Sequence, residues 1–112
     1  MIEPRPASGL LVSALIRRVE AEGGSAMVIA RGDAVAGAIL LLLADRGRLL
    51  RIAERMFRFE GGFGLDYVGP EDPDNPGVAG DYVARRRRSD PDLWVVEIDH
   101  PESERLAREL LG

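Results

Sequence analysis

The stretch Leu93-Trp94-Val95-Val96-Glu97-Ile98 decides the fold of this chain, because its apolar, β-branched and aromatic side chains predict a strand. Four consecutive arginines at positions 85–88 precede it, and the dipeptide Asp90-Pro91 separates the two. A residue before proline is disfavoured in a helix, so the arginines are expected to end a helix and the strand to follow a turn. The densest positive charge of the chain is thereby joined to its only tryptophan.

Outward from this junction, hydrophobic periodicity predicts three helices and three further strands. The helices are expected over 9–22 with Ser8 as the N-cap, from about 74–77 to 88, and over 101–111. The strands are expected over 25–31, 37–44 and 48–53, in addition to 93–99. Segment 37–44 could also form a helix capped by Asp33, but Gly37 and the flanking turn residues favour a buried strand.

These elements predict a single α+β domain, 1–112, in which about three helices pack on a small, mainly antiparallel sheet. The first three strands are expected to form a three-strand meander. The long connection before the fourth strand allows that strand to lie beside the first. Residues 1–7 are expected to be an irregular lead-in, and the glycines and prolines of 60–76 predict a mobile loop.

Composition excludes several classes of protein. The chain contains no cysteine and no lysine, and all fifteen of its basic residues are arginine. A thiolate zinc site, a cysteine nucleophile, a Schiff-base lysine and a P-loop are therefore ruled out. We expect no metal, no cofactor and no enzymatic activity. The longest apolar run, 38–44, is too short to span a bilayer and no secretory signal is seen, so a cytoplasmic protein without membrane association is expected.

Three stretches of the chain, at 15–19, 30–40 and 82–98, resemble short alphaproteobacterial proteins catalogued as a domain of unknown function, DUF1491. The specific part is the junction Arg-Arg-x-Asp-Pro-Asp-Leu-Trp-Val-Val-Glu, which ends at Glu97. The resemblance covers about half of the chain and leaves 54–76 unmatched. It implies a small cytoplasmic bacterial protein and brings no activity with it.

The arginines at 85–88 have two interpretations. Together with Arg17 or Arg18 of the first helix, they could bind an anion or nucleic acid; the residues concerned are Arg85, Arg86, Arg87 and Arg88. Alternatively, they offset the helix dipole, and at least one must turn inward because four consecutive helical positions sweep about 300° around the axis. We favour the structural interpretation, because charge runs are commonly solvated or paired.

Glu97 is a carboxylate among apolar neighbours, since strand alternation places it on the same face as Leu93 and Val95. Such a carboxylate could be a catalytic acid or base. It could equally be the partner of a buried arginine, with Arg18 and Arg87 as the natural candidates. We expect the structural ion pair.

An exposed aromatic surface is predicted around the glycine-rich segment that follows the third strand. Its expected members are Phe57, Phe59, Phe63 and Tyr67. Exposed apolar patches of this kind mark contacts with other proteins. We therefore expect a non-enzymatic interaction or regulatory protein that binds an unknown protein partner or self-associates. The alternative is an anion or nucleic-acid binding module that uses the arginines.

Overall fold

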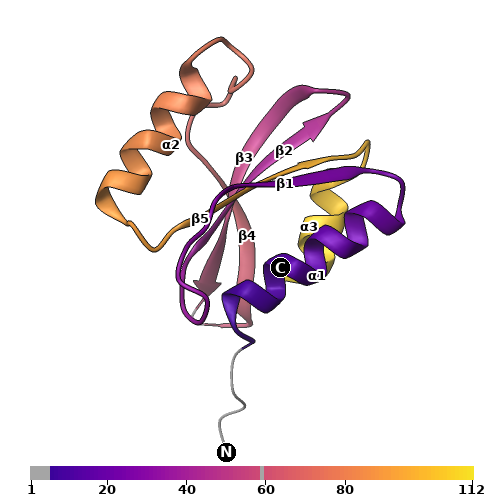
Figure 1. Ribbon diagram of the computed structural model, residues 1–112, viewed down its shortest axis with the longest axis vertical. Coiled ribbons are helices and arrows are strands. Elements are labelled where there is room, and N and C mark those ends of the chain that lie inside the picture. Colours follow the sequence, from indigo (N-terminus) through magenta and orange to yellow (C-terminus); the bar gives the residue numbers. More distant parts are fainter. Residues whose placement is uncertain (1–5, 59) are drawn as a thin grey trace, which may run out of the picture.

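The computed structural model describes residues 6–58 and 60–112, and over these residues it contains three helices and a five-stranded sheet (Figure 1). In chain order the elements are α1 (Ser8–Ala21), β1 (Ser25–Ala30), β2 (Ile39–Asp45), β3 (Arg48–Arg58), β4 (Gly62–Val68), α2 (Val78–Ser89), β5 (Trp94–Asp99) and α3 (Ser103–Leu111). The predicted α+β class is confirmed, and segment 37–44 contributes a strand rather than a helix.

The sheet has the order β1-β5-β2-β3-β4 and is mixed, because β5 runs parallel to β2 while the other neighbouring pairs are antiparallel. The expectation that the first three strands form the meander is wrong, because β5 lies between β1 and β2. The meander consists of β2, β3 and β4. Burial explains the order. β2 and β5 are buried along most of their length, which suits the middle of the sheet, whereas β1 has no buried residue and forms an edge.

The sheet is covered on both faces, with α1 and α3 on one face and α2 on the other (Figure 1). The core under α1 and α3 is the larger; its buried side chains include Leu15, Val19, Leu41, Leu43, Val96, Ile98 and Leu106. The core under α2 consists of Leu40, Leu42, Ile52, Leu93 and Val95. No residue of α2 is itself fully buried, so the α2 layer is the more open one.

Strand β4 corrects the expectation of a mobile loop over 60–76. It pairs with β3 in continuous antiparallel register, from Ile52 opposite Val68 to Arg58 opposite Gly62. Gly61 and Gly62 adopt left-handed backbone conformations (φ 92° and 77°), so these glycines form the turn that starts the strand instead of breaking it. The irregular part of the segment begins only after Val68.

Candidate functional site

Trp94 stands at the centre of a packed junction between β5 and the loop that connects β1 to β2. Its indole Nε1 donates a hydrogen bond to the backbone carbonyl of Asp33 (2.7 Å), and its backbone N–H donates to Ala38 (2.8 Å). A Cβ atom at Gly32 or Gly37 would collide with the carbonyl oxygen of Asp92. Both glycines are therefore required for the close approach of the two segments.

The same loop holds the start of α1. The backbone N–H groups of Ser8 and Gly9 donate to the carbonyls of Val35 (3.1 Å) and Ala34 (2.9 Å). The expectation that Ser8 is the N-cap is wrong, since Ala7 occupies that position and makes no side-chain cap. The Ser8 hydroxyl instead donates to the carbonyl of Gly37 (2.6 Å). Loop carbonyls thus satisfy helix donors that a capping side chain would otherwise serve.

Arg87 joins α2 to this junction. Its Nη1 donates to the backbone carbonyls of Leu93 (2.9 Å) and Arg31 (3.1 Å). Arg86 also turns inward, where its Nη1 lies 2.6 Å from Oε1 of Glu54 and 3.0 Å from the hydroxyl of Tyr82. The hydrogen bond with Glu54 raises the pKa of Arg86 above its usual value. Two of the four consecutive arginines therefore connect α2 to the sheet and its loops.

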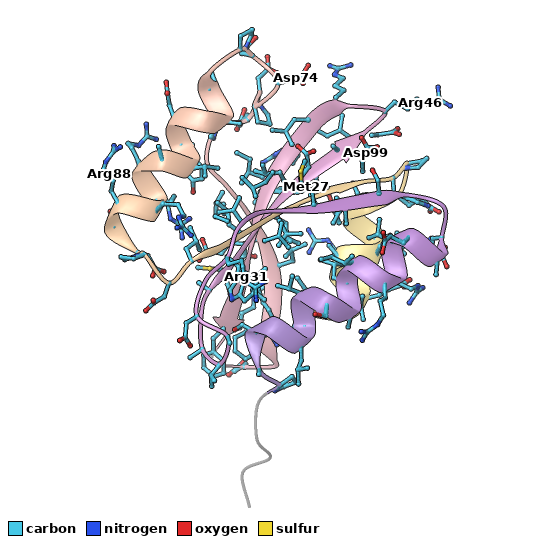
Figure 2. The ribbon with its side chains drawn as sticks, in the orientation of Figure 1. Met27, Arg31, Arg46, Asp74, Arg88 and Asp99 are labelled. Carbon is cyan, nitrogen blue, oxygen red and sulfur yellow. The ribbon has the colours of Figure 1, made fainter. Side chains whose placement is uncertain are left out.

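The remaining arginines of the predicted binding set do not form one patch. Arg85 and Arg88 are exposed on α2, whereas Arg17 and Arg18 belong to α1, which covers the opposite face of the sheet. Figure 2 shows Arg88 on α2, on the side of the molecule away from α1. The geometry does not bring the two groups of arginines together around a common ligand.

The ion pair expected for Glu97 is not among those of the described residues. Arg18 pairs with Glu109 (2.7 Å) and Glu22 (3.5 Å), and Arg87 donates to backbone carbonyls. Glu97 faces the side of the sheet that α2 covers and lies between Met27 and Leu42 in the strand register. Its place is therefore on the opposite face from Arg18, which explains why that pair cannot form.

Phe57 and Phe63 face each other across β3 and β4, with ring centroids 5.4 Å apart and planes at 71°. The guanidinium of Arg55 lies 3.6 Å from the Phe63 centroid, and its Nε donates to the carbonyl of Leu111 at the end of α3 (3.1 Å). Phe57 is 56% exposed. The two aromatic rings thus lie where the cover given by α3 ends. Phe59 lies outside the described residues.

Tyr67, the other expected member of the aromatic surface, is part of the contact between β4 and α3. Its hydroxyl hydrogen-bonds to the carboxylate of Glu104, which raises the pKa of Tyr67. The guanidinium of Arg51 lies 3.8 Å from its ring centroid, and that of Arg108 lies 5.8 Å away. The structure therefore brings Phe57 and Phe63 together but assigns Tyr67 to a separate cluster.

A pocket of about 230 Å³ lies beside Phe63. Its lining includes Val35, Gly37, Ile39, Arg55 and Phe63, and the side chain of Val35 is 71% exposed. We call the group Val35, Arg55, Phe57 and Phe63 the aromatic end. Sequence reasoning did not include Val35 or Arg55, although the period-two alternation of Phe63, Leu65 and Tyr67 indicates a strand that would have placed Phe63 beside β3.

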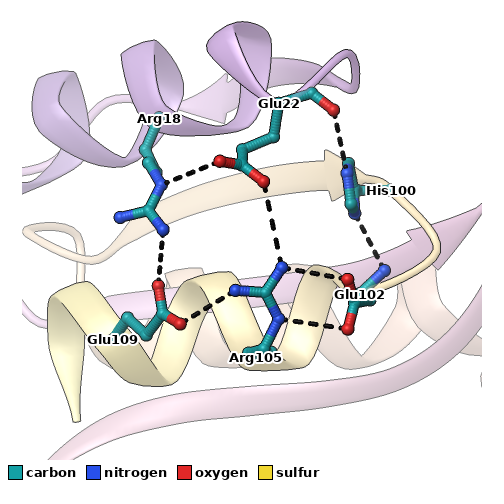
Figure 3. A network of polar contacts seen from close by, with 6 residues as sticks. All are labelled: Arg18, Glu22, His100, Glu102, Arg105 and Glu109. Atoms are coloured by element: carbon teal, nitrogen blue, oxygen red, sulfur yellow. Dashed lines mark hydrogen bonds and ion pairs between the residues drawn. The ribbon is translucent and has the colours of Figure 1, made fainter.

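A network of polar contacts connects α1 to α3 where the two helices lie side by side (Figure 3). Arg105 binds Glu102 and Glu109 through contacts of 2.9 Å, and Arg18 completes the link to α1. Hydrogen bonds from Arg105 lower the pKa values of both Glu102 and Glu109. His100 continues the network at the start of α3.

Over residues 6–58 and 60–112, no group of three or more histidine, cysteine, aspartate or glutamate side chains is arranged to hold a metal ion. Within the same residues, no helix has the length and apolar character needed to cross a membrane.

Comparison with known proteins identifies one family. The model of the family described as "Protein of unknown function (DUF1491)" matches residues 7–108, which includes the segment 54–76. The crystal structure of a DUF1491 family protein from Caulobacter crescentus CB15 is similar to this chain, with 33% identity over 91% of this chain and 94% of the other, and a TM-score of 0.79.

Two structures determined in solution agree with this match. An NMR structure of a DUF1491 family protein from Caulobacter crescentus CB15 has 36% identity over 89% of this chain and 90% of the other, with a TM-score of 0.72. Protein Atu0922 from A. tumefaciens has 32% identity over 85% and 86% of the two chains, with a TM-score of 0.64. No curated protein matches the chain.

Proposed function

Because the chain belongs to the DUF1491 family, whose function is unknown, we propose its function from its own geometry: a non-enzymatic, cytoplasmic protein that binds a partner protein through the aromatic end. The observation that supports this proposal best is the exposure of Phe57. This ring is 56% exposed although Phe63 packs against it in an edge-to-face arrangement, and it lies at the end of the sheet face that α3 covers only in part. Aromatic side chains are enriched at protein interfaces and account for much of their binding energy.

The neighbouring pocket defines the kind of partner. Polar and apolar groups contribute about equally to its walls, which include the loop residues 35–39 together with Arg55 and Phe63. A partner that inserts a side chain into this pocket would contact Val35 and Phe63, and it would also approach Phe57, which packs against Phe63. The guanidinium of Arg55 lies 3.6 Å from the centroid of the Phe63 ring, so a cationic group is part of the same pocket wall.

The anion or nucleic-acid alternative has less support. Arg86 and Arg87 are occupied by Glu54 and by backbone carbonyls, and a phosphate would have to displace these contacts. Arg85 and Arg88 alone offer few of the phosphate contacts from which nucleic-acid affinity is built.

A photo-crosslinking amino acid at position 57 tests the proposal in living cells. Leu50 provides the control position, because it lies on the same strand and is exposed as well (43%), but it lies at the opposite end of β3. We expect a discrete adduct from position 57 and none from position 50. An adduct of twice the mass of the chain would identify a second copy as the partner. No adduct from 57, or the same adducts from both positions, would contradict the proposal.

A further inference from the structure

We propose that the protonation state of His100 controls a hydrogen-bonded connection between the end of α1 and the start of α3. The neutral ring hydrogen-bonds to the end of one helix and to the start of the other, and the protonated ring loses the hydrogen bond at the start of α3. This inference is independent of the aromatic end and concerns the opposite end of the same helix pair.

The hydrogen bonds of the ring require one protonation state. Nε2 lies 3.0 Å from the carbonyl oxygen of Glu22, and Nδ1 lies 2.8 Å from the backbone nitrogen of Glu102. A carbonyl can only accept, so Nε2 carries a hydrogen; the backbone N–H can only donate, so Nδ1 carries none. The arrangement therefore assigns the neutral Nε2–H tautomer.

Both partners of the ring belong to helix ends. Glu22 follows the last residue of α1, and Glu102 directly precedes the first residue of α3. Helix ends leave backbone groups that the helix itself cannot satisfy. His100 satisfies one such group on each helix, and its own carbonyl accepts from the N–H of Ser103 (3.1 Å). A single side chain thus connects the two helices end to end (Figure 3).

A second proton on the ring acts on one of these two bonds. Protonated Nδ1 becomes a donor that faces the donor N–H of Glu102, so this hydrogen bond cannot persist. The imidazolium would also stand at the positive end of the α3 dipole, which is unfavourable. The bond from Nε2 to the carbonyl of Glu22 is compatible with both states of the ring.

The charged groups around the ring give the imidazolium an alternative partner. From the helices and their ends they are Arg18, Glu22, Glu102, Arg105 and Glu109. A surface pocket lined by His100 adds Asp45, Arg46 and Asp99. The carboxylates of Glu22 and Glu102 attract a cation, although Arg105 already contacts both. Protonation is therefore expected to exchange a backbone hydrogen bond for a carboxylate contact at the same helix end, rather than to unfold the chain.

Because His100 is the only histidine, NMR spectroscopy of its ring nitrogens between pH 8 and pH 5 tests the proposal directly. At pH 8 we expect the Nε2–H tautomer. As the ring takes up its second proton, exchange of the Glu102 amide, corrected for its intrinsic pH dependence, should rise roughly threefold to tenfold, the effect of one lost hydrogen bond. The Ala36 amide, which donates to the carboxylate of Asp33 (2.8 Å) in the loop between β1 and β2, should not change and serves as the internal reference.

Two variants distinguish the role of Nδ1 from that of Nε2. In His100→Asn the amide oxygen can replace Nδ1 as the acceptor, so Glu102 should stay protected at all pH values. In His100→Gln the amide nitrogen can replace Nε2, but the amide oxygen no longer lies at the position of Nδ1, so exchange of Glu102 should be faster than in His100→Asn at all pH values. An Nδ1–H tautomer at pH 8, or protection of Glu102 that persists while the wild-type ring titrates, would overturn the proposal.

Discussion

Trp94 donates its indole N–H to the backbone carbonyl of Asp33 across 2.7 Å, although the two residues are separated by 61 positions in the sequence. This bond joins β5, an interior strand of the sheet, to the loop that holds the start of α1. Arg87 adds α2 to the same place. The segment 87–97, the most specific part of the family resemblance, therefore acts as an architectural junction of three elements.

Replacing Trp94 with phenylalanine tests the junction at its centre. The Trp94→Phe variant keeps an aromatic ring but loses the indole donor, so the carbonyl of Asp33 loses its partner. We expect the free energy of unfolding to fall by about 1–3 kcal/mol. Urea denaturation followed by circular dichroism measures this loss without relying on tryptophan fluorescence. A variant as stable as the wild type would show that the bond contributes nothing.

The glycines of the loop provide a second test. Gly37→Ala places a Cβ atom against the carbonyl of Asp92, and we expect a loss of about 1–3 kcal/mol, typical of overpacking. Gly80→Ala is the matched control, because its Cβ would meet nothing within 4 Å on helix α2. That change should stabilise the protein by about 0.5–1 kcal/mol. Thermal denaturation of both variants should therefore shift in opposite directions; shifts of the same sign would contradict the packing described.

Neighbouring arginines of α2 should differ in their contribution to stability. Arg87→Gln removes a donor shared by two backbone carbonyls and should cost about 1–2 kcal/mol. Arg88 is exposed, so Arg88→Gln should change the free energy of unfolding by less than about 0.5 kcal/mol. Equal effects of the two substitutions in urea denaturation would show that the arginine run acts only through its total charge.

Stability should decrease in acid through the carboxylates of α3. Hydrogen bonds from Arg105 lower the pKa values of Glu102 and Glu109 below the usual 4.5, and the hydrogen bond from Tyr67 lowers that of Glu104. A group whose pKa is lowered on folding stabilises the protein above its unfolded-state pKa, and this stabilisation is lost as the pH falls through the folded-state value.

The melting temperature between pH 6 and pH 3 measures this effect. We expect it to fall most steeply below about pH 4.5, where these carboxylates take up protons. Arg105→Gln removes the cause of two of the three shifts, so its curve should be flatter, whereas Arg88→Gln should follow the wild type. Because the groups are exposed, added salt should reduce the difference. Parallel curves for the wild type and Arg105→Gln at low salt would contradict the origin given for the shifts.

The strands at the centre of the sheet could be predicted because their own side chains determine their position. Segments 37–44 and 93–99 are apolar on both faces, and they form β2 and β5 in the middle of the sheet. The insertion of β5 between β1 and β2 could not be predicted, since it depends on contacts between segments far apart in the sequence. β4 was missed because its glycines were assigned to a loop, although Phe63, Leu65 and Tyr67 alternate as a strand requires.

In the candidate sites, too, some features could be predicted from the sequence and others could not. That an arginine of the run must turn inward follows from helix geometry, and Arg86 does so toward Glu54. The partner of Arg18 could not be predicted, because Glu109 approaches it only through the packing of α3 beside α1. Phe57 and Phe63 were identified by composition, but the pocket beside them is formed with Val35 from a loop on the other side of β2.

The central claim is that Phe57 is kept at the surface for a partner and not for the stability of the fold. The measurement that tests it most directly compares the free energies of unfolding of Phe57→Ala and Leu65→Ala. Both residues lie on the same face of the β3–β4 pair, but Leu65 is only 1% exposed. We expect Leu65→Ala to lose about 2–5 kcal/mol and Phe57→Ala to lose less than about 1 kcal/mol. A loss for Phe57→Ala as large as that for Leu65→Ala would place Phe57 in the core and contradict the account.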